Sequence, residues 1–137
     1  MTKLFLFLCF ALLPTYTHAF CFQEAGQRYG VSPSLLRAIA QAESNLNPFA
    51  TNHNGNGTVD VGLMQINSIW ADQLGSTWND LFDPCTNVMV GAWILSRCIQ
   101  DYGSTWQAVG CYHSRAPAKR DAYAARIAHI FQTETQP

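Results

Sequence analysis

Apolar residues recur at helical spacing along most of this chain, and Gly, Pro and Asn separate the apolar stretches. Leu36, Ile39, Ala40 and Glu43 follow the i, i+3, i+4, i+7 spacing of one helix face. Such surroundings remove the Glu43 carboxylate from water, which favours its neutral form and raises its pKa. A carboxyl group that stays protonated near neutral pH can act as a general acid. Glu43 is therefore the first catalytic candidate, and the alternative is an ordinary helix-end glutamate that reaches solvent.

Capping signals give the boundaries of this helix and its neighbours. Ser32 is a good N-cap and Pro33 suits the first helical position, so the helix carrying Glu43 should run to about Asn45. Residues 51–61, rich in Asn and Gly, predict turns that feed one or two short strands. Further helices are predicted over residues 22–29, 67–74, 78–82, 86–102, 104–112 (with Ser104 as the cap) and 119–132. The pattern predicts a mostly α (α+β) domain with a small β element beside Glu43.

The first nineteen residues have the composition of a secretory signal peptide. Lys3 precedes an apolar run, Leu4 to Leu13, and the sequence ending at Ala19 resembles a small-residue cleavage site. The run is too short to span a bilayer, so no membrane anchor is expected. We therefore predict a signal peptide over residues 1–19 and one exported domain over residues 20–137, located in the periplasm or secreted.

The cysteines agree with export to an oxidising compartment. Cys9 lies in the predicted signal peptide, and four others remain: Cys21, Cys85, Cys98 and Cys111. Cys85 and Cys98 cannot be bridged if they share one helix, because their Cα atoms would lie roughly 19 Å apart instead of about 4.4–6.8 Å. Two connectivities remain open, and we favour Cys21–Cys85 with Cys98–Cys111 over Cys21–Cys98 with Cys85–Cys111. No pair has the close spacing of a zinc knuckle.

The charge of the chain excludes some function classes. The formal net charge is only −1, which gives no general attraction to nucleic acid or to a membrane surface. The sequence shows no phosphate-binding loop, no metal-ligand cluster and no Ser/His/Asp order, so we expect no cofactor and no metal. A local basic stretch has two interpretations, a solvated helix face, which we favour, or a surface for an anionic polymer; it comprises Arg115, Lys119, Arg120 and Arg126.

Three motifs occur in order along residues 20–132: Glu43-Ser44-Asn45, then Gly62-Leu63-Met64-Gln65-Ile66-Asn67, then Gly110-Cys111-Tyr112-His113. Together they resemble the exported lytic transglycosylases of the soluble-lytic type, in particular the small single-domain group that accompanies bacterial secretion and conjugation machines. The resemblance implies a lysozyme-like fold. It also implies cleavage of the β-1,4 bond between N-acetylmuramic acid and N-acetylglucosamine in peptidoglycan, with a 1,6-anhydromuramoyl product.

The same resemblance implies roles for individual residues. Glu43 matches the acid/base, Ser44 a residue that orients the acid or the substrate acetamido group, and Gln65 a residue that lines the sugar cleft. Tyr112 matches a tyrosine near the acid. Each of the last three also has a structural interpretation, as an inert helix-end serine, a glutamine bonded to backbone and a core tyrosine. His113 stands where the family has asparagine, and its charge, unlike that of asparagine, would depend on pH.

The segment from Glu43 to Ser68 also resembles the active-site region of animal-type lysozymes. In that comparison Asp60 takes the place of the second carboxylate. An Asp60 about 5–5.5 Å from Glu43 would act as a nucleophile in hydrolysis. With Asp60 turned away, Glu43 would act alone and the sugar's own 6-hydroxyl would attack. A third interpretation of Asp60 is a turn residue bonded to nearby backbone.

We favour the transglycosylase, because the remaining cysteines do not form the dense lysozyme framework and the Gly110–Tyr112 motif belongs to the bacterial family. Peptidoglycan strands are the expected partner of what should be a monomer, together with components of a secretion or conjugation machine. Another class remains open, a glycan-binding module without turnover. Its groove would use Asn52, Asn54, Asn56, Trp70, Trp78 and Tyr112.

Overall fold

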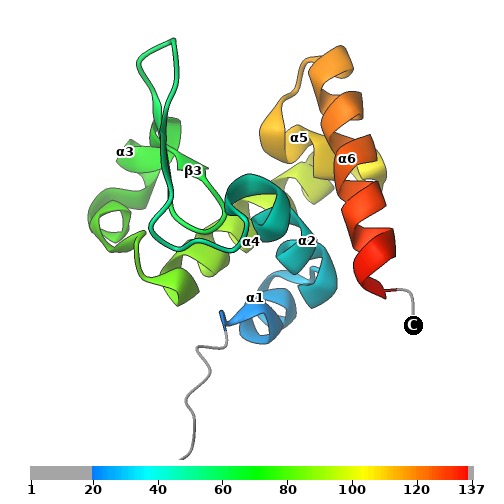
Figure 1. Ribbon diagram of the computed structural model, residues 1–137, viewed down its shortest axis with the longest axis horizontal. Coiled ribbons are helices and arrows are strands. Elements are labelled where there is room, and N and C mark those ends of the chain that lie inside the picture. Colours follow the sequence, from blue (N-terminus) through cyan, green and yellow to red (C-terminus); the bar gives the residue numbers. More distant parts are fainter. Residues whose placement is uncertain (1–19, 136–137) are drawn as a thin grey trace, which may run out of the picture.

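A computed structural model describes residues 20–135, so the predicted signal peptide over residues 1–19 and the last two residues lie outside the described part. Helices dominate and the three short strands form one antiparallel sheet in the order β1-β2-β3, as the mostly α (α+β) prediction required (Figure 1). The α-helices are α1 (Phe22–Tyr29), α2 (Pro33–Ser44), α3 (Ala71–Leu74), α4 (Pro84–Tyr102), α5 (Trp106–His113) and α6 (Pro117–Thr135). The other elements are β1 (Thr51–His53), β2 (Val59–Val61), β3 (Ile66–Asn67) and the 3₁₀ helices η1 (Ser68–Trp70) and η2 (Gly75–Asp80).

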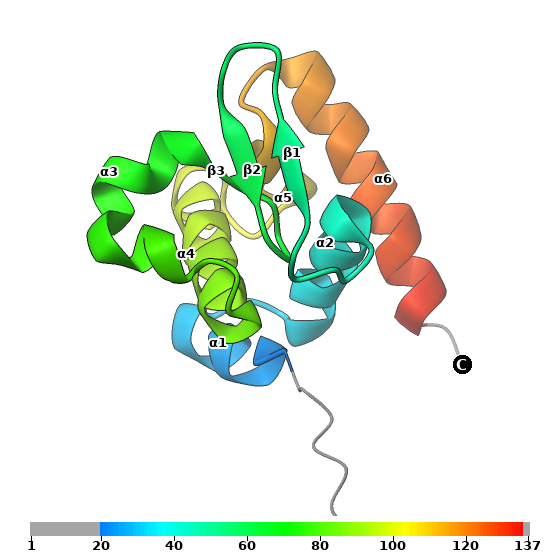
Figure 2. The ribbon, with the colours of Figure 1, turned by 60° about the vertical axis from the view of Figure 1, so that its left-hand side comes forward.

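Helix α4 forms the centre of the molecule. The sheet and α3 lie on one side of it and α6 on the other (Figures 1 and 2). Val88, Ala92 and Leu95 of α4 are fully buried, and α1, α2 and α5 pack around this helix. Among residues 20–135, no helix is both long and apolar enough to cross a membrane.

Several predicted boundaries were wrong by a few residues. The helix predicted over 67–74 is divided into the end of β3, η1 and α3, and the helix predicted over 78–82 is the 3₁₀ helix η2. Thr105, not Ser104, caps α5, because its hydroxyl accepts a hydrogen bond from the Ala108 amide at 3.3 Å. Helix α6 begins at Pro117, two residues before the predicted start at Lys119, since the fixed φ angle of proline suits the first helical position.

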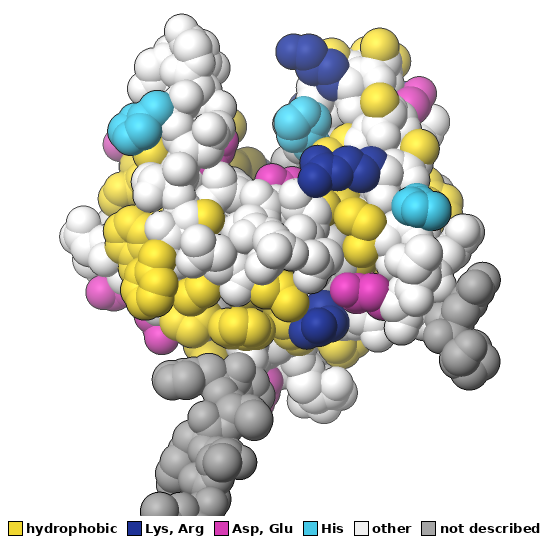
Figure 3. Space-filling view, in the orientation of Figure 1, with side chains coloured by type: hydrophobic (Ala, Val, Ile, Leu, Met, Phe, Trp, Pro, Cys, Tyr) yellow, Lys and Arg dark blue, Asp and Glu magenta, His cyan; other side chains and the backbone are white. Residues whose placement is uncertain are grey.

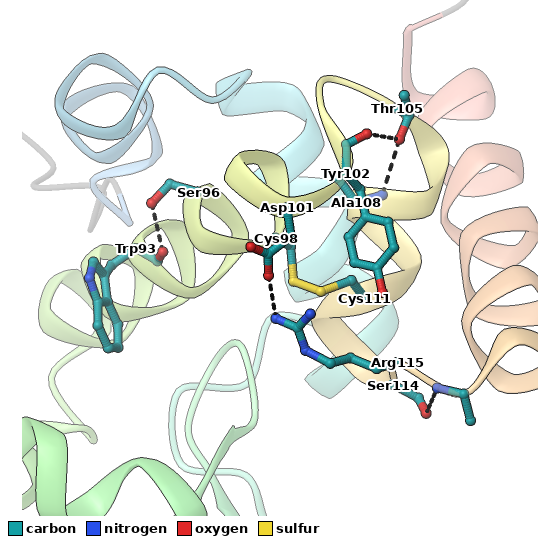
Figure 4. Close-up of a disulfide and its surroundings, with 11 residues drawn as sticks. Trp93, Ser96, Cys98, Asp101, Tyr102, Thr105, Ala108, Cys111, Ser114 and Arg115 are labelled. Carbon is teal, nitrogen blue, oxygen red and sulfur yellow. Dashed lines mark hydrogen bonds and ion pairs between the residues drawn. A yellow bond between two sulfur atoms is a disulfide. The ribbon is translucent and has the colours of Figure 1, made fainter.

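The two disulfides have the connectivity favoured from the sequence, and each joins two helices. Cys21–Cys85 ties the start of α1 to the start of α4, with a Cα–Cα distance of 5.1 Å. Cys98–Cys111 ties α4 to α5 at 5.8 Å, next to the ion pair between Arg115 and Asp101 (Figure 4). Each bridge should contribute about 3–4 kcal/mol by restricting the unfolded chain.

One buried polar side chain joins α4 to the sheet region. Asn87 has no solvent exposure, and its Nδ2 donates to the carbonyl oxygens of Val61 at 2.9 Å and Leu81 at 2.8 Å. Its Oδ1 accepts a hydrogen bond from the Met64 amide at 2.7 Å. Gly62 has a φ of 79°, and a Cβ there would lie 2.1 Å from Asn87 Nδ2, so only glycine leaves room for this amide.

We predict that Asn87→Ala lowers the free energy of unfolding by about 3 kcal/mol or more, because it leaves buried backbone groups without partners. Urea unfolding followed by circular dichroism measures this change. Gln132→Ala, at an exposed position of α6, is the control and should change stability by about 0.5 kcal/mol or less. Equal stability of the two variants would contradict the structural role of Asn87.

Candidate active site

A cleft of about 880 Å³ lies between the sheet and the α5–α6 side of the molecule. Figure 3 shows this hollow, with acidic side chains at its bottom and histidine and basic side chains on the α5–α6 side. The cleft is lined by five of the six residues that the sequence assigned to catalysis or substrate binding: Glu43, Asp60, Gln65, Tyr112 and His113. Segments far apart in the sequence therefore converge on one concave surface.

Glu43 lies in the last turn of α2, and its environment raises its pKa above the usual value for a glutamate. Burial is the largest cause, because it penalises the charged form. The negative charge of Asp60 also raises the pKa, whereas a hydrogen bond from Tyr123 and the positive charge of Arg126 lower it. The net direction is upward, as the apolar helix face predicted. Glu43 therefore keeps its proton to higher pH than an ordinary glutamate, which suits a general acid.

Tyr123 is a site residue that the sequence analysis missed. Its Oη donates a hydrogen bond to Oε1 of Glu43 from α6, and its side chain is buried. The ring of Tyr123 stacks on His113, with the ring centroids 4.9 Å apart. Burial and the neighbouring Glu43 charge raise the pKa of Tyr123 well above its usual value, so its hydroxyl stays a donor. A tyrosine on the buried stripe of α6 with Ile127 was the available signal, since a buried hydroxyl needs a partner.

Tyr112 lines the cleft and is hydrogen-bonded to the backbone of the second motif. Its Oη donates to the Met64 carbonyl at 2.8 Å. Burial, with the nearby charges of Glu43 and Asp60, raises the pKa of Tyr112 well above its usual value. Tyr112 therefore lies near Glu43, as the resemblance implied, while its hydroxyl donates its hydrogen bond to the Met64 carbonyl.

Ser44 and Gln65 mainly hold backbone. The Ser44 hydroxyl donates to the Leu63 carbonyl at 2.6 Å and is not among the residues that line the cleft, so its role toward the acid or the substrate stays a prediction. Gln65 lines the cleft but its Nε2 donates to the carbonyls of Gly62 at 2.9 Å and Ala50 at 3.2 Å. Its φ of 51° turns the chain sharply at this point. The backbone thus uses the Nε2 group of Gln65, and only the rest of this side chain is available to a ligand.

Asp60 is held by side-chain amides and not by the backbone of a turn. Its Oδ1 accepts a hydrogen bond from Asn67 Nδ2 at 2.6 Å. Its Oδ2 accepts from Asn54 Nδ2 at 2.8 Å and from Asn52 Nδ2 at 3.3 Å. These three donors come from β1, the hairpin turn and β3, and they fix the carboxylate on the sheet side of the cleft. They also use the amides of Asn52 and Asn54, which the binding-module hypothesis assigned to sugar.

Arg126 of α6 also binds near the acid. Its Nη2 donates to the Ala42 carbonyl at 2.6 Å, one residue before Glu43. This bond satisfies a carbonyl in the last turn of α2, where a cation is favourable. Tyr123 and Arg126 therefore join α6 to two consecutive residues in the last turn of α2, Glu43 and Ala42. Among residues 20–135, no group of three or more His, Cys, Asp or Glu side chains is arranged to hold a metal ion.

The model of the transglycosylase SLT domain family matches residues 20–131, nearly the whole described chain. The chain belongs to this family. An SLT domain cleaves the glycosidic bonds of peptidoglycan as a lytic transglycosylase, which favours an enzyme over a binding module without turnover.

Named relatives of this SLT domain match it over most of its length. Protein IpgF of Shigella sonnei is 40% identical over 120 residues, which cover 85% of this chain and 78% of the relative. Invasion protein IagB of Salmonella typhimurium is 42% identical over 112 residues, covering 79% and 70%. A peptidoglycan-binding-like protein of Escherichia coli O157:H7 is 33% identical over 132 residues, covering 85% and 79%.

We predict that Tyr123→Phe raises the pKa of Glu43 further, because it removes a hydrogen bond to the charged form. The pH profile of peptidoglycan cleavage should shift toward higher pH, and NMR titration of the Glu43 carboxyl should show the same shift. Tyr29→Phe, on α1, is the matched control and should leave the profile unchanged. A shift toward lower pH in Tyr123→Phe would contradict this assignment.

Proposed function

We propose that this chain cleaves the β-1,4 bond between N-acetylmuramic acid and N-acetylglucosamine and releases a 1,6-anhydromuramoyl end, with Glu43 as both acid and base. The observation that carries the proposal is the Glu43 carboxyl, which is partly buried, lines the cleft and is hydrogen-bonded to Tyr123. Because the pKa of Glu43 is raised, its carboxyl can hold the proton that the leaving sugar oxygen needs.

Two proton transfers complete the reaction. Glu43 first gives its proton to the glycosidic oxygen, and the bond from that oxygen to C1 of N-acetylmuramic acid breaks. The 2-acetamido group of the substrate stabilises the cationic sugar. Glu43, now charged, takes the proton of the 6-hydroxyl as its oxygen bonds to C1, which closes the anhydro ring and restores the acid. Tyr123 binds Oε1, so Oε2 is the oxygen that is available to the substrate.

Asp60 acts in this proposal as an electrostatic partner of the cationic sugar. It lines the same cleft as Glu43, and its charge affects the pKa of that residue. The three amide donors hold its oxygens in place, which suits a fixed negative charge better than a nucleophile that must form a bond. The second candidate function, hydrolysis by a lysozyme-type muramidase, requires Asp60 to attack C1 and water to finish the reaction.

The relatives and the predicted export support a proposal for the biological role. One relative is named an invasion protein, and the motifs resemble the small transglycosylases that accompany secretion and conjugation machines. The two disulfides suit an oxidising compartment outside the cytoplasm. We therefore propose that the enzyme opens the cell wall locally, from the periplasm, for an assembly that crosses the envelope.

Glu43→Gln should reduce cleavage of purified sacculi by about 10²–10⁴-fold, because it removes the transferable proton and keeps the size of the side chain. Release of soluble fragments measures the rate. Glu24→Gln, on the exposed face of α1, is the matched control and should retain full activity. Mass analysis of the products from the unmodified protein should find anhydro ends, each one water lighter than a hydrolysis product. Reducing ends would instead support the muramidase.

Asp60→Asn should lower kcat by on the order of tenfold to a hundredfold, since it removes a charge worth about 1.5–3 kcal/mol near the cationic transition state. The product should still carry the anhydro end. The pKa of Glu43 should also fall, because Asp60 normally raises it, so the pH profile should move toward lower pH. Asp72→Asn, on α3, serves as the control. An unchanged kcat in Asp60→Asn would remove Asp60 from the mechanism.

A further inference from the structure

The charges of the chain are unevenly distributed, and the cleft is their most basic region. Of the eight lysines and arginines in the sequence, four line the cleft, whereas only two of its nine acids, Glu43 and Asp60, do so. The chain as a whole has a formal charge of −1. The four cations are Arg97, Arg115, Lys119 and Arg126. A local excess of positive charge in a cleft attracts anionic ligands to it.

Two of these cations share one stripe of α6 with Tyr123. Lys119, Tyr123 and Arg126 have the i, i+4, i+7 spacing of a single helix face. Tyr123 binds Glu43, so the stripe passes the acid. With a rise of about 1.5 Å per residue, Arg126 lies roughly 4.5 Å along the axis on one side of Tyr123 and Lys119 roughly 6 Å on the other. The basic stripe therefore lies where the substrate must bind.

The cations differ in how far the protein itself uses them. Arg126 is bonded to the Ala42 carbonyl, and Arg97 lies over the rings of Trp70 and Trp93 at 5.8 and 5.2 Å. Arg115 pairs with Asp101 at 2.6 Å but keeps 62% of its side chain exposed (Figure 4). Because a guanidinium has five N–H donors, Arg115 can still bind a second anion.

Lys119 is the cation with the fewest partners. Its side chain is exposed, and within residues 20–135 it makes no hydrogen bond or ion pair to another side chain. It lies in the first turn of α6, four residues after Arg115. Together they form the basic corner of the cleft, the term used below for Arg115 and Lys119.

The sugar rings of the proposed substrate are uncharged and offer a cation no ionic partner. The anionic groups of peptidoglycan lie on the peptide stem, which is attached through the lactyl group of N-acetylmuramic acid and carries free carboxylates. The opposite wall of the cleft is formed by the asparagine-rich sheet, which carries the Asp60 carboxylate and no lysine or arginine. A strand bound between the two walls would thus meet cations on one side and a single carboxylate on the other.

We propose that the basic corner, Lys119 and Arg115, binds carboxylates of the peptide stem, so that the enzyme selects glycan strands that still carry their peptides. This inference rests on the proposed function, since it assumes that a peptidoglycan strand occupies the cleft. It changes the interpretation of the basic stretch around α6 from a solvated helix face to a surface for an anionic polymer. Screening by salt should weaken the preference, because both cations are exposed.

The test compares intact glycan strands with the same strands after their carboxylates have been coupled to methylamine, which removes the charge and keeps the peptide. The quantity measured is the ratio of kcat/KM for charged and neutralised strands, at low and at high salt. The unmodified enzyme should prefer the charged strands. Lys119→Gln should lower the ratio by about two- to fivefold, and Lys119→Glu by more, as expected for exposed charge pairs. Arg28→Ala, an exposed cation of α1 outside the cleft, should leave the ratio unchanged.

Binding to the inactive Glu43→Gln variant separates this inference from the proposed function. NMR titration with a charged muropeptide should shift the signals of Lys119 and Arg115, and the neutralised muropeptide should bind more weakly. A ratio near one for the unmodified enzyme, or an unchanged ratio in both Lys119 variants, would overturn the role of the basic corner while leaving cleavage intact. If the unmodified enzyme does not cleave glycan strands, while binding still depends on their charge, the proposed function is rejected and the role of the basic corner is retained.

Discussion

The amide of Asn87 holds together the backbone on which the active site is built. It binds Val61, Leu81 and Met64 from the middle of the core, and its three bonds fix the chain on both sides of Leu63. Ser44, from the end of α2, donates to the Leu63 carbonyl, and Tyr112, from α5, donates to the Met64 carbonyl. The first and third sequence motifs are therefore bonded to the backbone of the second, and this stretch is positioned by Asn87 of α4.

The acid depends on this arrangement for its chemistry. The second motif packs beside the end of α2 and removes Glu43 from water, while α6 supplies the hydrogen bond from Tyr123 and the charge of Arg126. Burial raises the pKa of Glu43, and these two groups limit the rise. Asp60, fixed on the opposite wall by asparagines, adds a charge that a cationic sugar would meet.

Sequence patterns predicted the features that depend on residues close together in the chain, such as helix faces and the span of a single helix. The apolar face of α2 identified Glu43, and the length of α4 excluded the bond between Cys85 and Cys98 that the structure also lacks. Tyr123 was missed because its partner lies 80 residues away along the chain, and Asn87 because two of its three partners lie 23 and 26 residues away. β3 was missed because two residues are too few to show strand alternation. The bond from the Ser44 hydroxyl to Leu63 was not predicted, because sequence spacing cannot show where a hydroxyl points.

Burial of Glu43 also couples the active site to the stability of the fold. The folded protein holds the Glu43 proton to higher pH than the unfolded chain, in which the carboxyl has an ordinary pKa near 4.5. The contribution of this residue to stability is therefore greatest below that value and declines as the pH rises through the raised pKa of the folded state. Above that raised pKa, the ionised carboxyl opposes folding. A side chain of similar size that cannot ionise would remove this dependence of stability on pH.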